Sequence, residues 1–222
     1  MTLPQERLIP ILATIQMLKL RAIALLLAFH PVGISAQETG QSNKRLTPAE
    51  LREQSKPGPE HQMLAEFAGR WKLSVSAQGK RGVSTGSARS YMTLENRFLW
   101  IGYDARGKAG NFKGAFTIGF DRRHSEFTLI AMDTDGTYFV TSRGKRASGA
   151  KTIKLTGKDD DPHMKALGFE KEFAHVLDLS GKDSFSIKVL YIDNRTDERK
   201  EIEALEFKFE RQPKPPSTDR SQ

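Results

Sequence analysis

The sequence predicts an all-β protein: a single antiparallel up-and-down β-barrel of about ten strands with a short N-terminal helix. Short runs of alternating apolar and polar residues recur along the body of the chain, and Gly-rich or Asp/Asn-rich turns separate them. No helical periodicity lies between these runs. The 222 residues include 13 Phe and 18 Gly, which favours strands and tight turns. A sandwich of two sheets is the alternative.

The first expected strand begins at Trp71, where Trp71, Leu73, Val75 and Ala77 alternate with polar residues. Nine further runs are expected to be strands: 84–94, 97–104, 112–121, 126–133, 137–142, 151–157, 169–179, 184–193 and 200–210. A closed barrel of this many strands is wide enough that side chains need not fill it, so a cavity is expected.

The segments at the two ends of the barrel domain, residues 57–211, have a different character. Residues 37–56 are polar and contain a short helix, because Thr47, Pro48 and Glu50 form a capping-box pattern. A second helix is expected from Pro59, ended by Gly69. Residues 212–222 are Pro-rich and charged, and are expected to be unstructured.

Residues 1–36 have the pattern of a signal peptide. Lys19 and Arg21 precede the apolar run AIALLLAF at 22–29, and Ala36 offers a small-residue cleavage site before Gln37. The apolar run is too short for a membrane anchor. The expected location is therefore periplasmic or secreted, with membrane contact only through the signal peptide.

Composition narrows the classes of function. The chain has no cysteine, which excludes disulfides, thiolate catalysis and Cys-ligated metals. The net charge is +8, but basic and acidic residues are interleaved, which is typical of a solvated surface and not of a nucleic-acid site. No phosphate loop, dinucleotide fingerprint, zinc motif or nucleophile elbow occurs, so catalysis has no positive support.

Two sequence blocks carry a family resemblance. The first is PGPEH at 57–61 followed by LAEFAGRW at 64–71, and the second is FKG at 112–114 with GFD at 119–121, then Phe127 and Asp133. Together they resemble the bacterial family called domain of unknown function 1579, over roughly residues 57–210. That resemblance implies no assigned biochemical role.

The triplet Gly69, Arg70 and Trp71 is also similar to the G-x-W that opens the first strand of lipocalins and other calycins. The similarity implies a calycin-like barrel in which Trp71 plugs the closed end and Arg211 stacks over its ring. Such a cation–π contact is worth about 0.5–2 kcal/mol.

Five residues are candidates for binding a ligand. Trp100, Tyr103 and Tyr138 are strand aromatics that line a pocket or pack in the core. Asp133 ends an otherwise apolar face, where burial would raise its pKa. His175 alternates with apolar residues and is expected to face inward.

No resident cofactor or metal is expected, because no second histidine lies at a metal-ligand spacing from His175 and His163 follows an acidic run in a loop. Haem ligation by His175, as in nitrobindin-type barrels, is the alternative.

The expected function is binding of a small, largely apolar molecule in the barrel of an exported protein. One alternative is a hydrolase- or isomerase-type enzyme that uses Asp133 as a buried acid. Another is an envelope interaction protein with a solid barrel and an exposed apolar patch.

The signal-peptide pattern is compact only from Met17 onward, so we predict that translation starts at Met17. N-terminal sequencing of the precursor is expected to read Met17 first. A precursor that begins at Met1 would contradict this start site.

Overall fold

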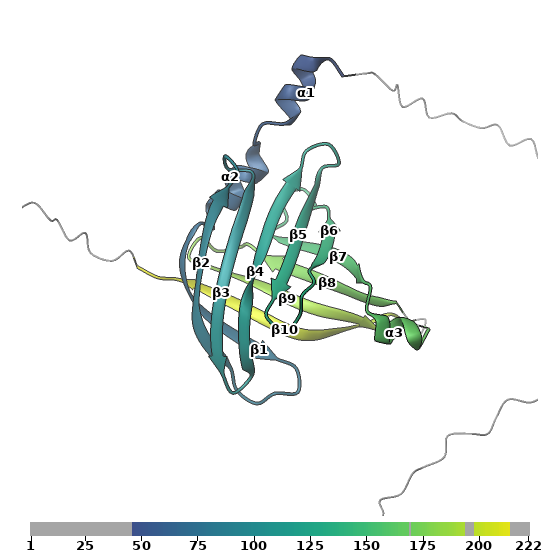
Figure 1. The fold of residues 1–222 in the computed structure, drawn as a ribbon. Coiled ribbons are helices and arrows are strands. Elements are labelled where there is room, and N and C mark those ends of the chain that lie inside the picture. The colour runs from purple at the N-terminus through teal and green to yellow at the C-terminus, as the bar shows by residue number, and fades with distance from the viewer. Residues whose placement is uncertain (1–45, 169, 194–197, 214–222) are drawn as a thin grey trace, which may run out of the picture. The chain divides into compact units, whose positions relative to one another are not determined.

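Ten antiparallel strands close into one barrel in the computed structural model, which describes residues 46–168, 170–193 and 198–213 (Figure 1). Every strand pairs with its neighbour in sequence, and the first pairs with the last, so the predicted up-and-down barrel is confirmed. The strands are β1 (Gly69–Ala77), β2 (Ser84–Thr93), β3 (Phe98–Gly107), β4 (Gly110–Asp121), β5 (Glu126–Asp133), β6 (Val140–Gly144), β7 (Thr152–Asp159), β8 (Lys171–Asp178), β9 (Ser184–Asp193) and β10 (Lys200–Arg211).

Two short helices precede the barrel. Helix α1 (Pro48–Gln54) has the predicted capping box, in which Thr47 Oγ1 accepts from Glu50 N–H at 3.2 Å and Glu50 Oε2 accepts from Thr47 N–H at 2.7 Å. Helix α2 (Pro59–Ala65) begins where His61 Nδ1 accepts the Gly58 N–H at 3.0 Å. Leu64, on α2, is buried in the barrel core. Helix α2 therefore covers one end of the barrel, called the closed end below.

The structure differs from the sequence prediction at three places. Helix α2 ends at Ala65, and Gly69 begins β1 instead of ending the helix. Helix α3 (Pro162–Ala166) carries His163, which the sequence placed in a loop. Pro162 has the fixed φ of a first helical residue, and Lys165 N–H bonds back to Asp161 C=O at 3.0 Å. Strand β6 begins at Val140 and not at residue 137, because a turn at Thr134 and Asp135 and a bend at Thr137 precede it.

Trp71 and Arg211 hold the closed end together. Trp71 is fully buried, and its Nε1–H donates to Ser90 Oγ at 2.8 Å. The Arg211 guanidinium lies over the indole with its Cζ 4.3 Å from the ring centroid, as the calycin resemblance implied. The same guanidinium donates to the backbone oxygens of Ala68 and Glu66 after α2, and to Lys182 in the β8–β9 turn.

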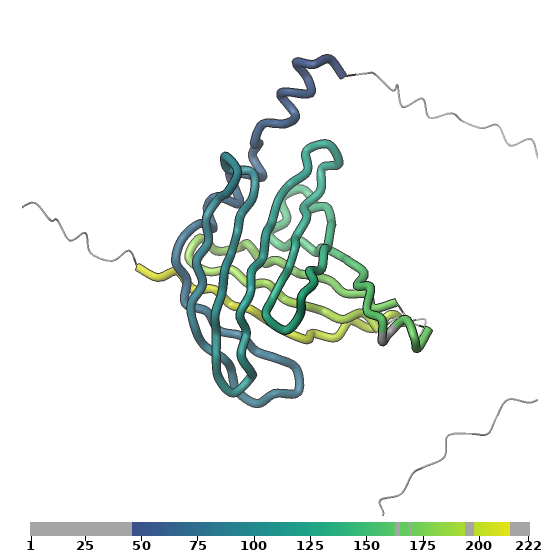
Figure 2. Tube along the Cα trace, viewed as in Figure 1, coloured from purple at the N-terminus to yellow at the C-terminus, as the bar shows by residue number. Residues whose placement is uncertain are grey.

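Gly69 is required by the same contact. Its φ is +154°, a backbone conformation that residues other than glycine rarely adopt. A Cβ at this position would lie 2.7 Å from Arg211 Nη1. Strands β1 and β10 run side by side from this point, which closes the barrel (Figure 2).

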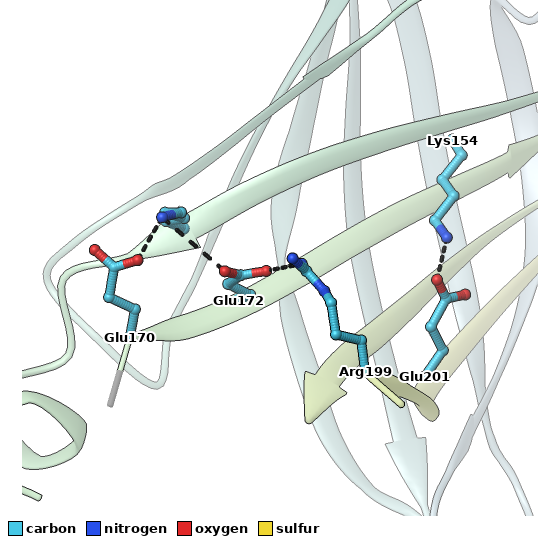
Figure 3. Close-up of polar contacts among 6 residues, drawn as sticks. Lys154, Glu170, Glu172, Arg199 and Glu201 are labelled. Carbon is cyan, nitrogen blue, oxygen red and sulfur yellow. Dashed lines mark hydrogen bonds and ion pairs between the residues drawn. The ribbon is translucent and has the colours of Figure 1, made fainter. Parts of the chain in front are cut away.

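Ion pairs cross the outer face of the later strands. Glu172 on β8 contacts both Lys158 on β7 and Arg199 before β10, while Lys158 also contacts Glu170 (Figure 3). Exposed pairs of this kind contribute little to stability. On this surface, each of these charged side chains lies next to one of opposite charge.

Two sequence predictions fall on residues that the structure does not describe. The signal peptide at 1–36 lies wholly outside the described ranges, and the tail at 212–222 lies outside them from residue 214. In the described ranges, none of the helices has the length and apolar character needed to cross a bilayer.

We predict that Arg211→Ala destabilises the barrel by about 2–3 kcal/mol, since it removes the cation–π contact and leaves backbone oxygens without donors. Arg211→Lys should recover only part of this loss, because an ammonium cannot reach the same acceptors at once. Urea unfolding measures both, with the outward-facing Arg89→Ala as control. Equal stability of the Lys variant and the wild type would exclude a specific role for the guanidinium.

Candidate functional site

A cavity of about 140 Å³ lies inside the barrel at the open end, opposite α2. We call it the inner cavity. It contains four of the five predicted ligand-binding residues, contributed by β3, the end of β5, the β5–β6 connection and β8: Tyr103, Asp133, Tyr138 and His175. The rest of its lining is mainly apolar and aromatic and consists of Phe116, Ala131, Met132, Val140, Asp159, Lys171, Phe173, Val189, Tyr191, Leu205 and Phe207.

Aromatic rings form the floor of the inner cavity. Tyr103 stacks on Phe116 with ring centroids 5.0 Å apart, and Phe207 packs edge-on against Phe116 at 5.3 Å. Phe173 meets the His175 ring at 5.4 Å. These residues occupy the inward positions of their strands, and the inward position predicted for His175 is confirmed. Below this floor the barrel is filled by its own core.

His175 is buried, as its apolar neighbours predicted, and is 2% exposed. Its Nδ1 lies 2.8 Å from Ser142 Oγ on β6. Burial lowers the pKa of His175 to about 4, so the ring is neutral near pH 7. Every fully buried polar side-chain atom of the described residues has a partner. We infer that Nε2, which bonds to no described residue, reaches the surface of the inner cavity.

Ser142 is a site residue that sequence reasoning did not single out. It is fully buried and lies 33 positions from His175 in sequence. The sequence pattern could have indicated Ser142, because this serine occupies an inward position of its strand, where an apolar residue is usual. A buried hydroxyl there anticipates a polar partner on a neighbouring strand.

The expectation that Asp133 is buried was wrong. The side chain is exposed, and its Oδ1 accepts the Asp135 N–H at 2.9 Å in a turn that begins at the strand end. The inward phase of β5 continues to this position, but the barrel wall ends there. Tyr103 lies within range of its charge: burial first, and then the charges of Asp133 and Asp135, raise the pKa of the Tyr103 phenol.

Tyr138 lines the rim of the inner cavity from the connection between β5 and β6, and not from a strand as predicted. Its side chain is 62% exposed. The ring packs so closely over Gly136 that a Cβ there would lie 2.4 Å from Tyr138 Cε1. Tyr138 is therefore a rim residue that is accessible to solvent and to a ligand.

Trp100 does not line the inner cavity, and its prediction as a lining residue there is corrected. Leu99 and Ile101 point inward, so Trp100 faces outward, where its ring lies 5.0 Å from that of Tyr91. Both aromatics border a shallow depression of about 850 Å³ across the outside of β1 to β5, which we call the outer groove and which Asp133 also borders. Gly102 and Ala115 are among its other lining residues.

The inner cavity does not fit a haem group. Its volume of about 140 Å³ is below the roughly 300–1,000 Å³ of typical small-molecule pockets, and Ser142 holds one nitrogen of His175. Over the described residues, no group of three or more histidines and carboxylates comes together in a way that could hold a metal ion.

We predict that His175 makes stability depend on pH. Its pKa is lower in the folded chain, about 4, than the ordinary 6.5, so the unfolded state binds more protons between these values and stability falls as the pH drops through them. From pH 7 to pH 4.5 the wild type should lose about 2 kcal/mol more than His175→Gln, which retains a hydrogen-bonding group. Urea unfolding at both pH values measures the difference, and equal losses would contradict the prediction. His61, whose pKa burial also lowers, is present in both proteins and cancels.

Comparison with known proteins gives a family but no activity. No curated protein matches the chain. Similar solved structures include a de novo designed fluorescence-activating beta barrel, with 13% identity over 66% of this chain and 94% of that chain and a TM-score of 0.36. Another is EF1p2_mFAP2b bound to DFHBI, with 10% identity over 68% of this chain and 98% of that chain and a TM-score of 0.38. Residues 56–211 match the family described as "Protein of unknown function (DUF1579)", and because this match spans more than half of the chain, the protein belongs to that family, as its sequence blocks predicted.

Proposed function

We propose that this protein is exported and binds a compact, largely apolar molecule in the inner cavity. The observation that carries the binding proposal is the cavity itself, a partly open space floored by aromatic rings and rimmed by polar groups at the open end. Pockets that bind small molecules have this combination of an apolar lining and a few placed polar groups.

Size limits the ligand to about one ring. A cavity of about 150 Å³ lined by apolar side chains is large enough to hold a benzene molecule. The inner cavity, at about 140 Å³, is similar in size. Transfer of an aromatic ring from water into it would be driven by burial of apolar surface, at about 25 cal/mol per Å² before the cost of immobilising the ligand. A larger ligand would extend past Tyr138 into solvent.

Catalysis has less support than binding. An acid–base mechanism on Asp133 needs a second titratable group within hydrogen-bond reach. In the described part of the chain the Asp133 carboxylate instead accepts the Asp135 backbone N–H. The Ser142–His175 pair has the composition of a nucleophile and a base, but Ser142 is fully buried and does not line the inner cavity. A substrate could not reach its hydroxyl.

The export proposal rests on residues 17–36 alone, where basic residues, an apolar run and a small-residue cleavage site follow one another. The third alternative, an interaction protein with a solid barrel, fits the structure less well, because the lumen is not filled at its open end.

We predict that fluorobenzene binds in the inner cavity and that Ala131→Leu weakens this binding at least about tenfold, because the larger side chain occupies the space of the ring. Ala131 lines the inner cavity, whereas Ala115, on the neighbouring strand, lines the outer groove. Titration followed by ¹⁹F NMR measures the affinity.

Ala115→Leu is the matched control and should leave the affinity unchanged. Loss of binding in the Ala115 variant alone would move the site to the outer groove. Absence of binding to the wild type would reject the proposed function.

A further inference from the structure

The charged groups that line the inner cavity do not balance. Lys171 is already neutralised, because its Nζ lies 3.0 Å from Asp159 Oδ2 and 3.4 Å from Asp161 Oδ2. His175 is neutral near pH 7 because burial lowers its pKa to about 4. Asp133 takes part in no ion pair with any described residue. Among the residues that line the cavity, Asp159 and Lys171 cancel, and Asp133 therefore leaves one net negative charge at the rim.

The field of this carboxylate reaches the aromatic floor. The charge of Asp133 helps to raise the pKa of the Tyr103 phenol, which lies on the floor of the cavity. The Tyr103 hydroxyl is also close to the end of the barrel wall, because a Cβ on Gly114 would lie 2.7 Å from it, and Gly114 pairs with Asp133. The charge of Asp133 therefore acts on the floor of the cavity. This local negative charge contrasts with the net charge of the whole protein, which is +8.

The rim is also lined by aromatic rings that can attract a cation. The ammonium of Lys171 already lies over the ring of Tyr191, 5.6 Å from its centroid. Tyr138, on the same cavity, is 62% exposed and has no such cation among the described residues. Aromatic faces attract organic cations, and the attraction adds to that of a nearby carboxylate.

We propose that the inner cavity selects an organic cation: a molecule with a ring-sized apolar group attached to a protonated amine. This inference rests on the proposed function and specifies its ligand class. The apolar group occupies the space between Phe116, Phe173 and Phe207. The ammonium lies at the rim between Asp133 and Tyr138, where it remains partly hydrated and avoids the cost of full burial.

Three ligands of nearly equal size test the charge preference at pH 7: 4-fluorobenzylamine, 4-fluorobenzyl alcohol and 4-fluorobenzoate, titrated by ¹⁹F NMR. The amine should bind about fivefold more tightly than the alcohol, which is the size expected for a partly exposed ion pair with a cation–π contact. The benzoate should bind most weakly.

Asp133→Asn should bring the affinity for the amine to that for the alcohol and leave the alcohol unchanged. Asp178→Asn is the matched control, because Asp178 also ends a strand and accepts the N–H two residues on, from Ser180 at 3.1 Å, but does not line the cavity. This control should retain the preference for the amine.

The outcomes separate the two proposals. Equal affinity for amine and alcohol in the wild type, or an unchanged preference in Asp133→Asn, overturns the cation inference and leaves the binding function intact. Tightest binding of the benzoate overturns it in favour of Lys171 as the dominant charge. If neither fluorobenzene nor any of the three ligands binds, the proposed function itself fails.

Discussion

The contact of the Arg211 guanidinium with Trp71 is the interaction on which the barrel depends. It joins the last strand to the first and ties both to the backbone after α2 and to the β8–β9 turn. The chain has no cysteine, so no disulfide shares this role. Trp71 in turn packs against Phe185 at 4.8 Å, and Phe185 stacks on Phe209 at 4.2 Å. Closure and core packing are therefore the same set of contacts at this end.

The lumen is left unfilled at the open end. Strand pairing also becomes sparse there. The β5–β6 ladder stops at Ala131 and Val140, before β5 ends at Asp133, and the described β6–β7 pairing, at Arg143 and Thr156, does not extend to this end. The connection that carries Tyr138 leaves the wall at this point. The cavity, with its aromatic floor and a loop at its rim, lies where this pairing ends.

Alternation predicted the strands and the inward position of His175, because one face of each strand must be apolar. Alternation could not predict that Trp100 faces outward, because Leu99 and Ile101 on either side of it are also apolar. Which face of this strand is buried depends on how the strand pairs with its neighbours. It also misjudged Asp133, which has the inward phase but lies where the wall ends. The side of a strand on which a residue lies can be predicted from its immediate neighbours in sequence. The point at which the barrel wall ends depends on all ten strands together.

The inner cavity has a stability cost that bears on its purpose. An unfilled apolar space of about 140 Å³ would cost about 3 kcal/mol if it were dry. Sequences fill such space easily: a longer side chain at Ala131, which lines the cavity, would occupy part of it. Instead the cavity retains His175, with one nitrogen turned to the lumen, and the Asp133 carboxylate at the rim. Water that bonded to these polar groups would lower this cost, and an entering ligand would displace it. On the proposed function, a cavity with an aromatic floor and a negative charge at its rim would gain free energy from a ligand that is apolar at one end and cationic at the other.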